Sequence, residues 1–183
     1  MDSCNVTLLG DQDGETMFNR ADFSIDAGRS QFLRPIDRNN DEERLEFLRK
    51  LPRSYRVGCF LFVHGSPRNP LSEFVFPEDI YNHRKMERLF QLIEHCCFQG
   101  HTRAAGVFTE RFEFFSPEEI DYEYVLADGK TMVNVGSVDE SRDREKRASY
   151  VVLDDRLPDG VEPAEADCAT ALKPARISFR RPG

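Results

Sequence analysis

The chain has 183 residues, a formal net charge of −8 and a pI near 5.1. This length fits one domain, and 39% hydrophobic residues, with 15 Phe among them, can build a buried core. The acidic balance argues against general binding of nucleic acids or anionic membranes, which require basic surfaces. An anionic substrate would need local cations or metal ions.

The cysteines indicate a reducing compartment. They are odd in number and lack the C-x-x-C spacing of many zinc sites, and Cys96 and Cys97 are adjacent. Adjacent cysteines suit neither a zinc knuckle nor an ordinary disulfide, so we expect reduced thiols and a cytoplasmic protein. No stretch approaches the roughly 18 apolar residues of a membrane-spanning helix.

The first predicted element is a buried strand at residues 6–9. A turn at residues 10–14 follows it, made of residue types that tolerate unusual backbone angles. A strand so close to Met1 would leave an unpaired edge, which favours self-association through residues 6–9. Residues 40–51 then predict a helix with Asn40 or Asp41 as its cap and leucines on its apolar stripe.

Residues 55–63 predict one or two strands, the second of which stops at His64. Gly65 and Pro67 break the apolar run, because Gly and Pro end regular structure. A polar side chain at the carboxyl end of a buried strand lies where α/β folds place ligands. The alternative is a histidine that only bonds a neighbouring backbone group.

The rest of the chain predicts mainly strands. Residues 82–95 form an amphipathic helix, and further strands are expected at residues 96–99, 106–109, 112–115, 122–126, 131–135, 149–153 and 177–179. Their close spacing predicts an antiparallel sheet rather than βαβ units. The stretch from 154 to 174 is rich in Asp, Glu, Pro and Ala, which predicts an exposed, mobile loop.

Polar turns follow three of the predicted strands, at residues 10–13, 64–65 and 100–103. Each offers a carboxylate or an imidazole at the carboxyl end of its strand. This combination of ligands suits Mn, Fe, Zn or Ni. The glycines in these turns let the backbone come close to an ion or a phosphate.

Three segments carry a resemblance to a known family: VHGSPRNPLSEFVFPEDIYN, FQGHTRAAGVFTE and MVNVGSVDESRDREKRASYVVLD. They resemble the C-terminal two-thirds of calcineurin-like metallophosphoesterases, in the bacterial branch labelled diadenosine-tetraphosphatase-like or protein-phosphatase-like. The resemblance implies an α+β fold of two packed sheets flanked by helices, lacking the N-terminal βα units. The match covers about residues 4–154 and implies a partial phosphoesterase domain at 1–154. The residue pattern beyond it predicts a flexible acidic loop at 155–174 and a terminal strand within 175–183.

The resemblance also implies a chemistry. The family uses two metal ions, bridged by an aspartate and a hydroxide, to attack phosphorus in line. Asp11 stands at the position of an asparagine ligand, His64 matches a lone histidine ligand, and His101 matches the first histidine of Gly-His-x-His. All three would belong to the second metal site, which implies one divalent ion at most.

Other positions depart from the family pattern. Gln12 replaces the histidine that helps to protonate the leaving oxygen, and glutamine cannot act as a general acid near neutral pH. Arg103 replaces a first-site histidine ligand with a permanent cation. Arg142 matches the family, so both arginines are candidates for contacts to a phosphate. The Asp-x-His and bridging-aspartate motifs have no match in the chain.

Two hypotheses remain open. The first is a phosphoesterase that hydrolyses phosphomonoesters or phosphodiesters, dinucleoside polyphosphates among them, with impaired turnover. The second is a catalytically inactive remnant that binds a metal ion, a phosphate-containing small molecule or a protein. A misassigned start would favour the first, although Gln12 and Arg103 would still weaken the site.

Overall fold

The computed structural model describes residues 6–17, 42–126, 129–138, 148–154 and 175–180. The helices are α1 (Asp11–Met17), α2 (Glu42–Lys50) and α3 (His83–Gln91), with short 3-10 helices η1 (Pro77–Tyr81) and η2 (Glu118–Ile120). The strands are β1 (Ser54–Val57), β2 (Phe60–Val63), β3 (Cys96–Gln99), β4 (Gly106–Thr109), β5 (Phe114–Phe115), β6 (Glu123–Val125), β7 (Thr131–Asn134), β8 (Tyr150–Asp154) and β9 (Arg176–Arg180). Nearly every predicted strand is thereby confirmed.

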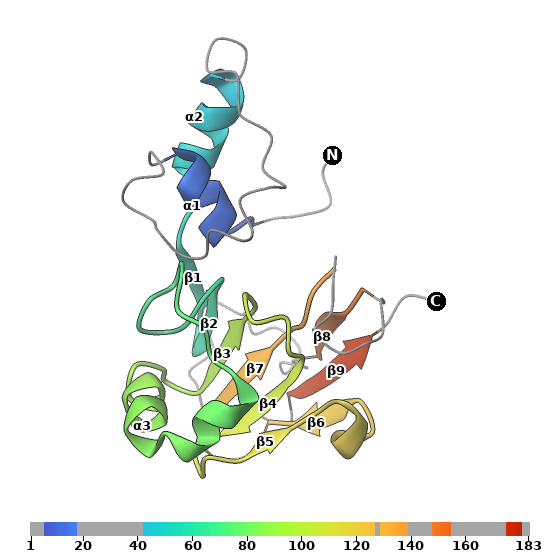
Figure 1. Ribbon diagram of the computed structural model, residues 1–183. Coiled ribbons are helices and arrows are strands. Elements are labelled where there is room, and N and C mark those ends of the chain that lie inside the picture. Colours follow the sequence, from blue (N-terminus) through green and yellow to red (C-terminus); the bar gives the residue numbers. More distant parts are fainter. Residues whose placement is uncertain (1–5, 18–41, 127–128, 139–147, 155–174, 181–183) are drawn as a thin grey trace.

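These strands form two sheets, as Figure 1 shows. The larger has the order β1-β2-β3-β7-β4-β5 and the smaller the order β6-β9-β8. The prediction of antiparallel pairing is only partly right, because β2, β3 and β7 run parallel. The connection from β2 to β3 contains α3, so this part of the chain is a βαβ unit, whose crossover length the strand spacing alone did not reveal.

The larger sheet lies between two hydrophobic cores, because side chains alternate across each strand. On one face, Phe60 and Phe98 pack toward the smaller sheet, which contributes Ile177 and Phe179. On the other face, apolar residues of the same strands pack against α3; they include Leu61, Val63, Cys97 and Met132 from the sheet and Met86, Leu89 and Phe90 from the helix. The two packed sheets and the covering helix confirm the expected fold class.

Helix α3 is shorter than the predicted 82–95. The side chain of Asn82 accepts a hydrogen bond from the backbone N–H of Lys85 and caps the helix. At the other end, the backbone N–H of Leu92 donates to the carbonyl of Leu89, a tighter turn that ends the regular pattern. Ile93 is buried all the same, so the apolar stripe continues past the helix.

The predicted strand at residues 6–9 is wrong. This segment does not pair with any described strand of a sheet. The backbone N–H of Leu9 donates to the carbonyl of Pro52, and Val6 is 40% exposed. The predicted turn that follows is the first part of α1. The carboxylate of Asp13 accepts from the N–H of Gly10, which favours a helical first turn. The expected edge for self-association is therefore not a strand, and self-association remains a prediction.

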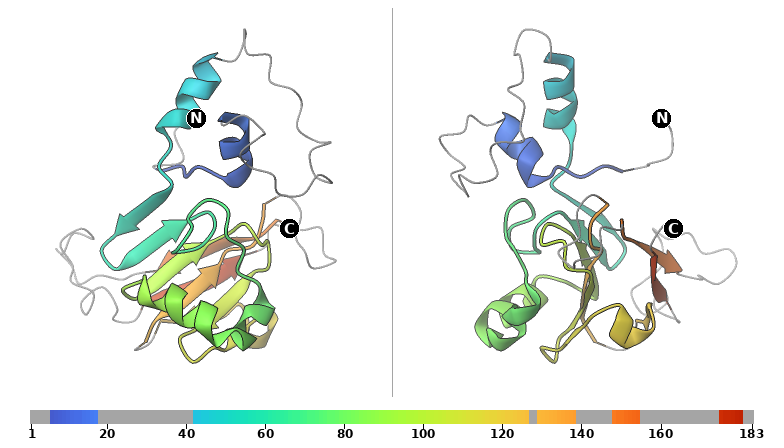
Figure 2. Two further views of the ribbon diagram at one scale, coloured as in Figure 1. Left: turned by 60° about the vertical axis from the view of Figure 1, so that its left-hand side comes forward. Right: turned by 45° about the vertical axis from the view of Figure 1, so that its right-hand side comes forward.

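Helix α2 confirms the predicted helix at 40–51, although its expected caps, Asn40 and Asp41, lie outside the described residues. With α1 it stands apart from the two sheets (Figures 1 and 2). Its apolar side chains are poorly covered, and Phe47 is 57% exposed. The expected acidic loop at 155–174 also lies outside the described residues.

Candidate metal centre

His64 is held at the carboxyl end of β2. Because β2 and β3 are parallel, their carboxyl ends meet at one edge of the sheet. The N–H of Gly100 donates to the carbonyl of His64 over 3.0 Å, which ties the two strand ends together. Gly65 turns the chain so tightly that a Cβ there would lie 2.6 Å from the carbonyl oxygen of Asn69. The strand-end position predicted for His64 is correct.

His101 follows β3 in an unusual backbone conformation. Its φ is 58°, in the left-handed region that non-glycine residues seldom adopt. The next residue anchors the turn, since the hydroxyl of Thr102 donates to the carbonyl of Val75. Phe74 stacks on the imidazole, with ring centroids 3.8 Å apart, and the side chain of His101 is 5% exposed. The stacked Phe74 and the anchored turn together restrict the ring of His101.

Asp11 reaches the two histidines from the start of α1. Its Oδ1 lies 2.9 Å from Nε2 of His64 and 3.6 Å from Nδ1 of His101. The two imidazole nitrogens are 3.1 Å apart. The structure therefore brings together three residues that are far apart in the sequence, and we call Asp11, His64 and His101 the triad.

The triad has the geometry of a partial coordination shell. Its three ligand atoms lie within 4.8 Å of one another, and among the described residues it is the one group of this kind. Ligands about 2.0–2.2 Å from an ion in tetrahedral or octahedral geometry lie about 2.8–3.6 Å apart. The observed separations match this range. Two imidazoles and one carboxylate fit Mn, Fe, Zn or Ni.

The electrostatics of the triad keep its carboxylate ionised. Burial by itself would raise the pKa of Asp11. The hydrogen bond with His64, the nearby charges of His101 and His64, and a backbone hydrogen bond of Gln12 together outweigh burial, so the pKa of Asp11 lies below its usual value. An ionised carboxylate is the form that binds a metal ion.

A polar loop supports the segment between His64 and Phe74. The hydroxyl of Ser66 donates to Glu73 over 2.5 Å, and Arg68 forms an ion pair with the same carboxylate. Burial would raise the pKa of Glu73, but the hydrogen bonds from Arg68 and Ser66 outweigh it, so this pKa is lowered. The loop carries Phe74 to the ring of His101.

The other predicted site residues have different outcomes. Gln12 is exposed, next to Asp11 in the first turn of α1. Arg103 lines a cavity of about 290 Å³, and its φ of 60° is again left-handed. Arg142 lies outside the described residues. Sequence reasoning missed Phe74, since an aromatic residue in a loop gives no signal of contact with a distant histidine.

The described cysteines take no part in this site. Cys59, Cys96 and Cys97 are free and buried. Burial raises the pKa of Cys96 and of Cys97, so these groups stay thiols rather than metal-binding thiolates. Cys4 and Cys168 lie outside the described residues. Among the described helices, none is long and apolar enough to cross a bilayer.

Comparison with known proteins finds two solved structures with a similar fold. A metallophosphoesterase from Sphaerobacter thermophilus superposes with a TM-score of 0.64 at 23% identity, over 98% of this chain and 66% of that one. A hypothetical protein from Pyrococcus horikoshii superposes with a TM-score of 0.60 at 17% identity, over 98% of this chain and 63% of that one.

Sequence comparison gives a weaker relation. An uncharacterized protein of Methanocaldococcus jannaschii is 28% identical over 122 residues, which are 62% of this chain and 45% of that protein. No protein-family profile matches the chain. The chain thus spans less than half of this relative and less than two-thirds of the two solved neighbours. The chain has a metallophosphoesterase-like fold of two packed sheets, with the triad at one edge of the larger sheet.

Proposed function

We propose that the protein binds one divalent metal ion through the triad and acts on phosphoesters there, as a phosphoesterase with low turnover. The observation that carries the proposal is the convergence of one carboxylate oxygen and two imidazole nitrogens from three separate segments. The likeness of the fold to a metallophosphoesterase supports the same reading. Phosphomonoesters and phosphodiesters, including dinucleoside polyphosphates, are the proposed substrates.

A bound ion supplies Lewis-acid polarisation of a phosphoryl oxygen and activation of water. The residues of the chain hold the histidine ligands in place and supply a positive charge. Phe74 and the left-handed turn hold the ring of His101, and the tie between Gly100 and His64 fixes the second histidine. Arg103 places a permanent cation two residues beyond His101, and a guanidinium matches the oxygens of a phosphate.

Low turnover follows from the residue beside Asp11. Gln12 can donate a hydrogen bond to a leaving oxygen but cannot transfer a proton to it near neutral pH. Loss of general acid catalysis costs about 10²- to 10⁴-fold in rate. The described residues offer one group of metal ligands, whereas the family mechanism uses two ions.

The same observations favour a second candidate, a protein that binds a metal ion and a phosphate without turning over an ester. This candidate requires the triad and Arg103 but not a general acid. It differs from the first only in the chemical step. A turnover measurement therefore separates the two.

The test is hydrolysis of bis(4-nitrophenyl) phosphate by the manganese-loaded protein, with His64→Ala as the site variant. His83→Ala is the matched control, because His83 is exposed on α3 and stacks on Phe112 rather than on the triad. We expect slow turnover, below about 1 per second, that disappears in His64→Ala and persists in His83→Ala.

The other outcomes are equally informative. Metal binding without turnover would support the binding protein. Turnover that survives His64→Ala would exclude the triad as the catalytic site. Failure to bind metal and failure to hydrolyse the ester would contradict both candidates.

A further inference from the structure

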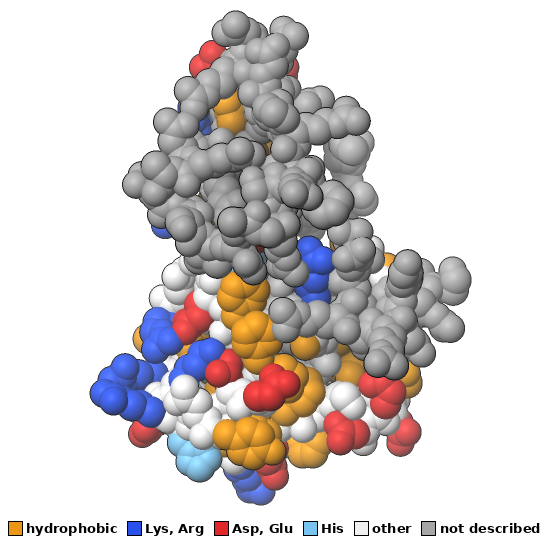
Figure 3. All heavy atoms as spheres, viewed as in Figure 1, with side chains coloured by type: hydrophobic (Ala, Val, Ile, Leu, Met, Phe, Trp, Pro, Cys, Tyr) orange, Lys and Arg blue, Asp and Glu red, His pale blue; other side chains and the backbone are white. Residues whose placement is uncertain are grey.

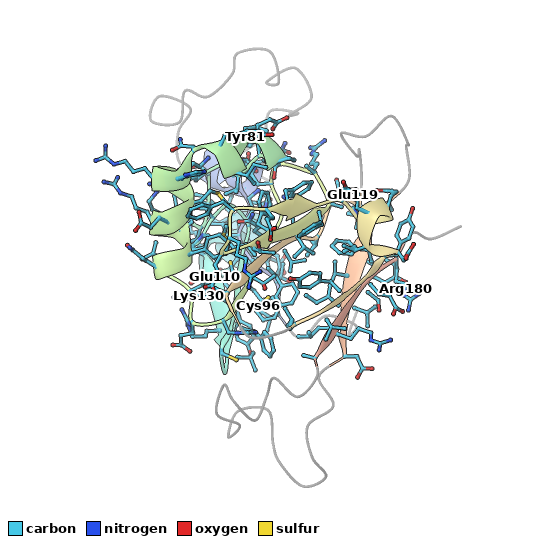
Figure 4. The ribbon with its side chains drawn as sticks, turned by 90° about the horizontal axis from the view of Figure 1, so that it is seen from below. Tyr81, Cys96, Glu110, Glu119, Lys130 and Arg180 are labelled. Atoms are coloured by element: carbon cyan, nitrogen blue, oxygen red, sulfur yellow. The ribbon has the colours of Figure 1, made fainter. Side chains whose placement is uncertain are left out.

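Two buried amide side chains end the neighbouring parallel strands β3 and β7. Gln99 pairs in register with Asn134, and both residues are buried. The starts of these strands, marked by Cys96 and by Lys130 just before β7, lie side by side in Figure 4, seen from below. Because the strands run parallel, the two amides lie together at the other edge of the sheet, where His101 follows β3.

The amide of Asn134 is bonded through both its nitrogen and its oxygen. Its Nδ2 donates to the carbonyl of Gly100 over 3.0 Å and to the hydroxyl of Thr102 over 2.5 Å. Its Oδ1 accepts from the N–H of Gly136 over 3.0 Å, which fixes the orientation of the amide. Asn134 therefore bonds both the residue before His101 and the residue after it.

The backbone at His101 requires support of this kind. Its φ of 58° lies in the left-handed region, which a non-glycine residue keeps only when its surroundings hold it there. The hydroxyl of Thr102 in turn donates to the carbonyl of Val75, next to Phe74, whose ring stacks on His101. The amide of Asn134 thus connects β7 to the turn and, through Thr102, to the loop that carries the stacked ring.

Gln99 offers a contrast at the paired position. Its side chain is 1% exposed, and neither its Oε1 nor its Nε2 has a hydrogen-bond partner among the described residues. Gln99 is nevertheless closer to His101 in the sequence than Asn134 is. Substitutions at the two positions therefore separate the loss of bonds to the turn from the general disturbance of a buried site at this edge of the sheet.

We propose that Asn134 is a positioning residue for the metal site: it holds the turn at residues 100–102 so that Nδ1 of His101 faces Asp11 and His64. The inference rests on the proposed function, because it takes the triad as the metal site. The nitrogen of the amide only donates hydrogen bonds, and its oxygen accepts from Gly136, so Asn134 acts through the turn rather than as a ligand. Loss of this support lets the ring of His101 turn away from the other two ligands.

The test compares Asn134→Ala with Gln99→Ala, which truncates the buried amide at the paired position and removes more atoms. Calorimetric titration with manganese measures the affinity, and circular dichroism establishes that each variant is folded. Nitrogen-15 NMR of the histidine rings in the metal-free protein reports the hydrogen bond between His101 and His64. A loss of stability alone would not change these ring signals, and the exposed His83 on α3 is the internal reference.

We expect Asn134→Ala to weaken manganese binding by about tenfold or more and to move the ring signals of His101. Gln99→Ala should leave both unchanged. Thr102→Val keeps the shape of the side chain but removes its hydroxyl, so it should act in the same direction as Asn134→Ala. Thr102→Ser keeps the hydroxyl and should bind manganese as the wild type does. This second pair of variants decides the test if Asn134→Ala does not fold.

Wild-type affinity and unmoved signals of His101 in folded Asn134→Ala would overturn the inference and leave the proposed function standing. Equal losses of affinity in Asn134→Ala and Gln99→Ala would overturn it as well, because they would show a general disturbance of the site. Failure of the wild-type protein to bind manganese would instead overturn the proposed function. The ring signals, recorded without metal, would then still decide the position of His101: moved signals in Asn134→Ala would support the inference, and unmoved signals would overturn it.

Discussion

The triad joins two regions of the molecule that differ in how firmly they are built. Its histidines belong to the two-sheet body, where they end or follow neighbouring parallel strands with buried residues on both faces. Asp11 belongs to the N-terminal helical region, α1 with α2, which stands apart from the sheets in Figure 2. Two ligands are therefore fixed by the core, whereas the third depends on a lightly packed helix.

The two-sheet body and the N-terminal helical region also differ in the side chains that they expose. In Figure 3 hydrophobic side chains gather down the middle of the viewed face of the body, and Lys and Arg gather on the side of α3. By contrast, the apolar side chains of α2 include the half-buried Leu45 and Leu48 and the exposed Phe47. Few buried apolar contacts mean low local stability. We therefore expect the position of Asp11 to be the adjustable part of the site.

The largest expected effect concerns the stability of the two regions. Leu89 is fully buried between α3 and the larger sheet, and Leu89→Ala should lower the free energy of unfolding by about 3 kcal/mol. Phe47 is 57% exposed on α2, and Phe47→Ala should change it by less than about 0.5 kcal/mol. Urea unfolding measures both. Equal losses would show that α2 packs as firmly as α3.

A smaller effect is expected at the carboxylate of the triad. Asp11→Ala removes one of three ligands and should weaken manganese binding by more than about tenfold, or about 1.4 kcal/mol. Asp11→Asn keeps an oxygen ligand without the charge, so it should lose less. Isothermal titration measures both affinities. If Asp11→Ala binds manganese as the wild type does, α1 does not hold a ligand.

The smallest effect concerns the loop that carries Phe74. The pKa of Glu73 is lowered in the folded protein, so its stabilising contribution is complete above the ordinary value of 4.5 and is lost as the pH falls through the lowered value. Glu73→Gln should cost about 1 kcal/mol at pH 7 and less in acid. Urea unfolding at several pH values checks this. The control is Glu46→Gln on the exposed α2, where the carboxylate pairs with Lys50 at the surface, and it should cost less than about 0.5 kcal/mol at pH 7.

Much of the body could be predicted from the sequence because its signals are local. The run Phe60–Val63 is apolar on both faces, and the glycines after it and before His101 mark strand ends. The parallel pairing of β2 and β3 is a long-range property, and the strand spacing predicted it wrongly. The periodicity of the sequence could not predict the contact of Phe74 with His101, because that contact depends on how a loop folds back.

The structure places Asp11 beside the two predicted histidines, but the local structure predicted around it is wrong. The short apolar run at residues 6–9 predicts a strand, but only Leu9 of that run is buried, and α1 begins where a turn was expected. Motif order identified Asp11, and motif order does not depend on secondary structure. Strand propensity gave a wrong prediction here because the segment makes one backbone hydrogen bond to Pro52 rather than pairing with a neighbouring strand.

The most direct test of the account is the metal content of the protein after manganese loading and equilibrium dialysis. The account predicts one ion per chain in the wild type and none in the double variant His64→Ala/His101→Ala. His83→Ala, remote from the triad, should retain the ion and so serves as the control. Two ions per chain, no ion in the wild type, or one ion that survives the double substitution would contradict the assignment of the triad as the metal site.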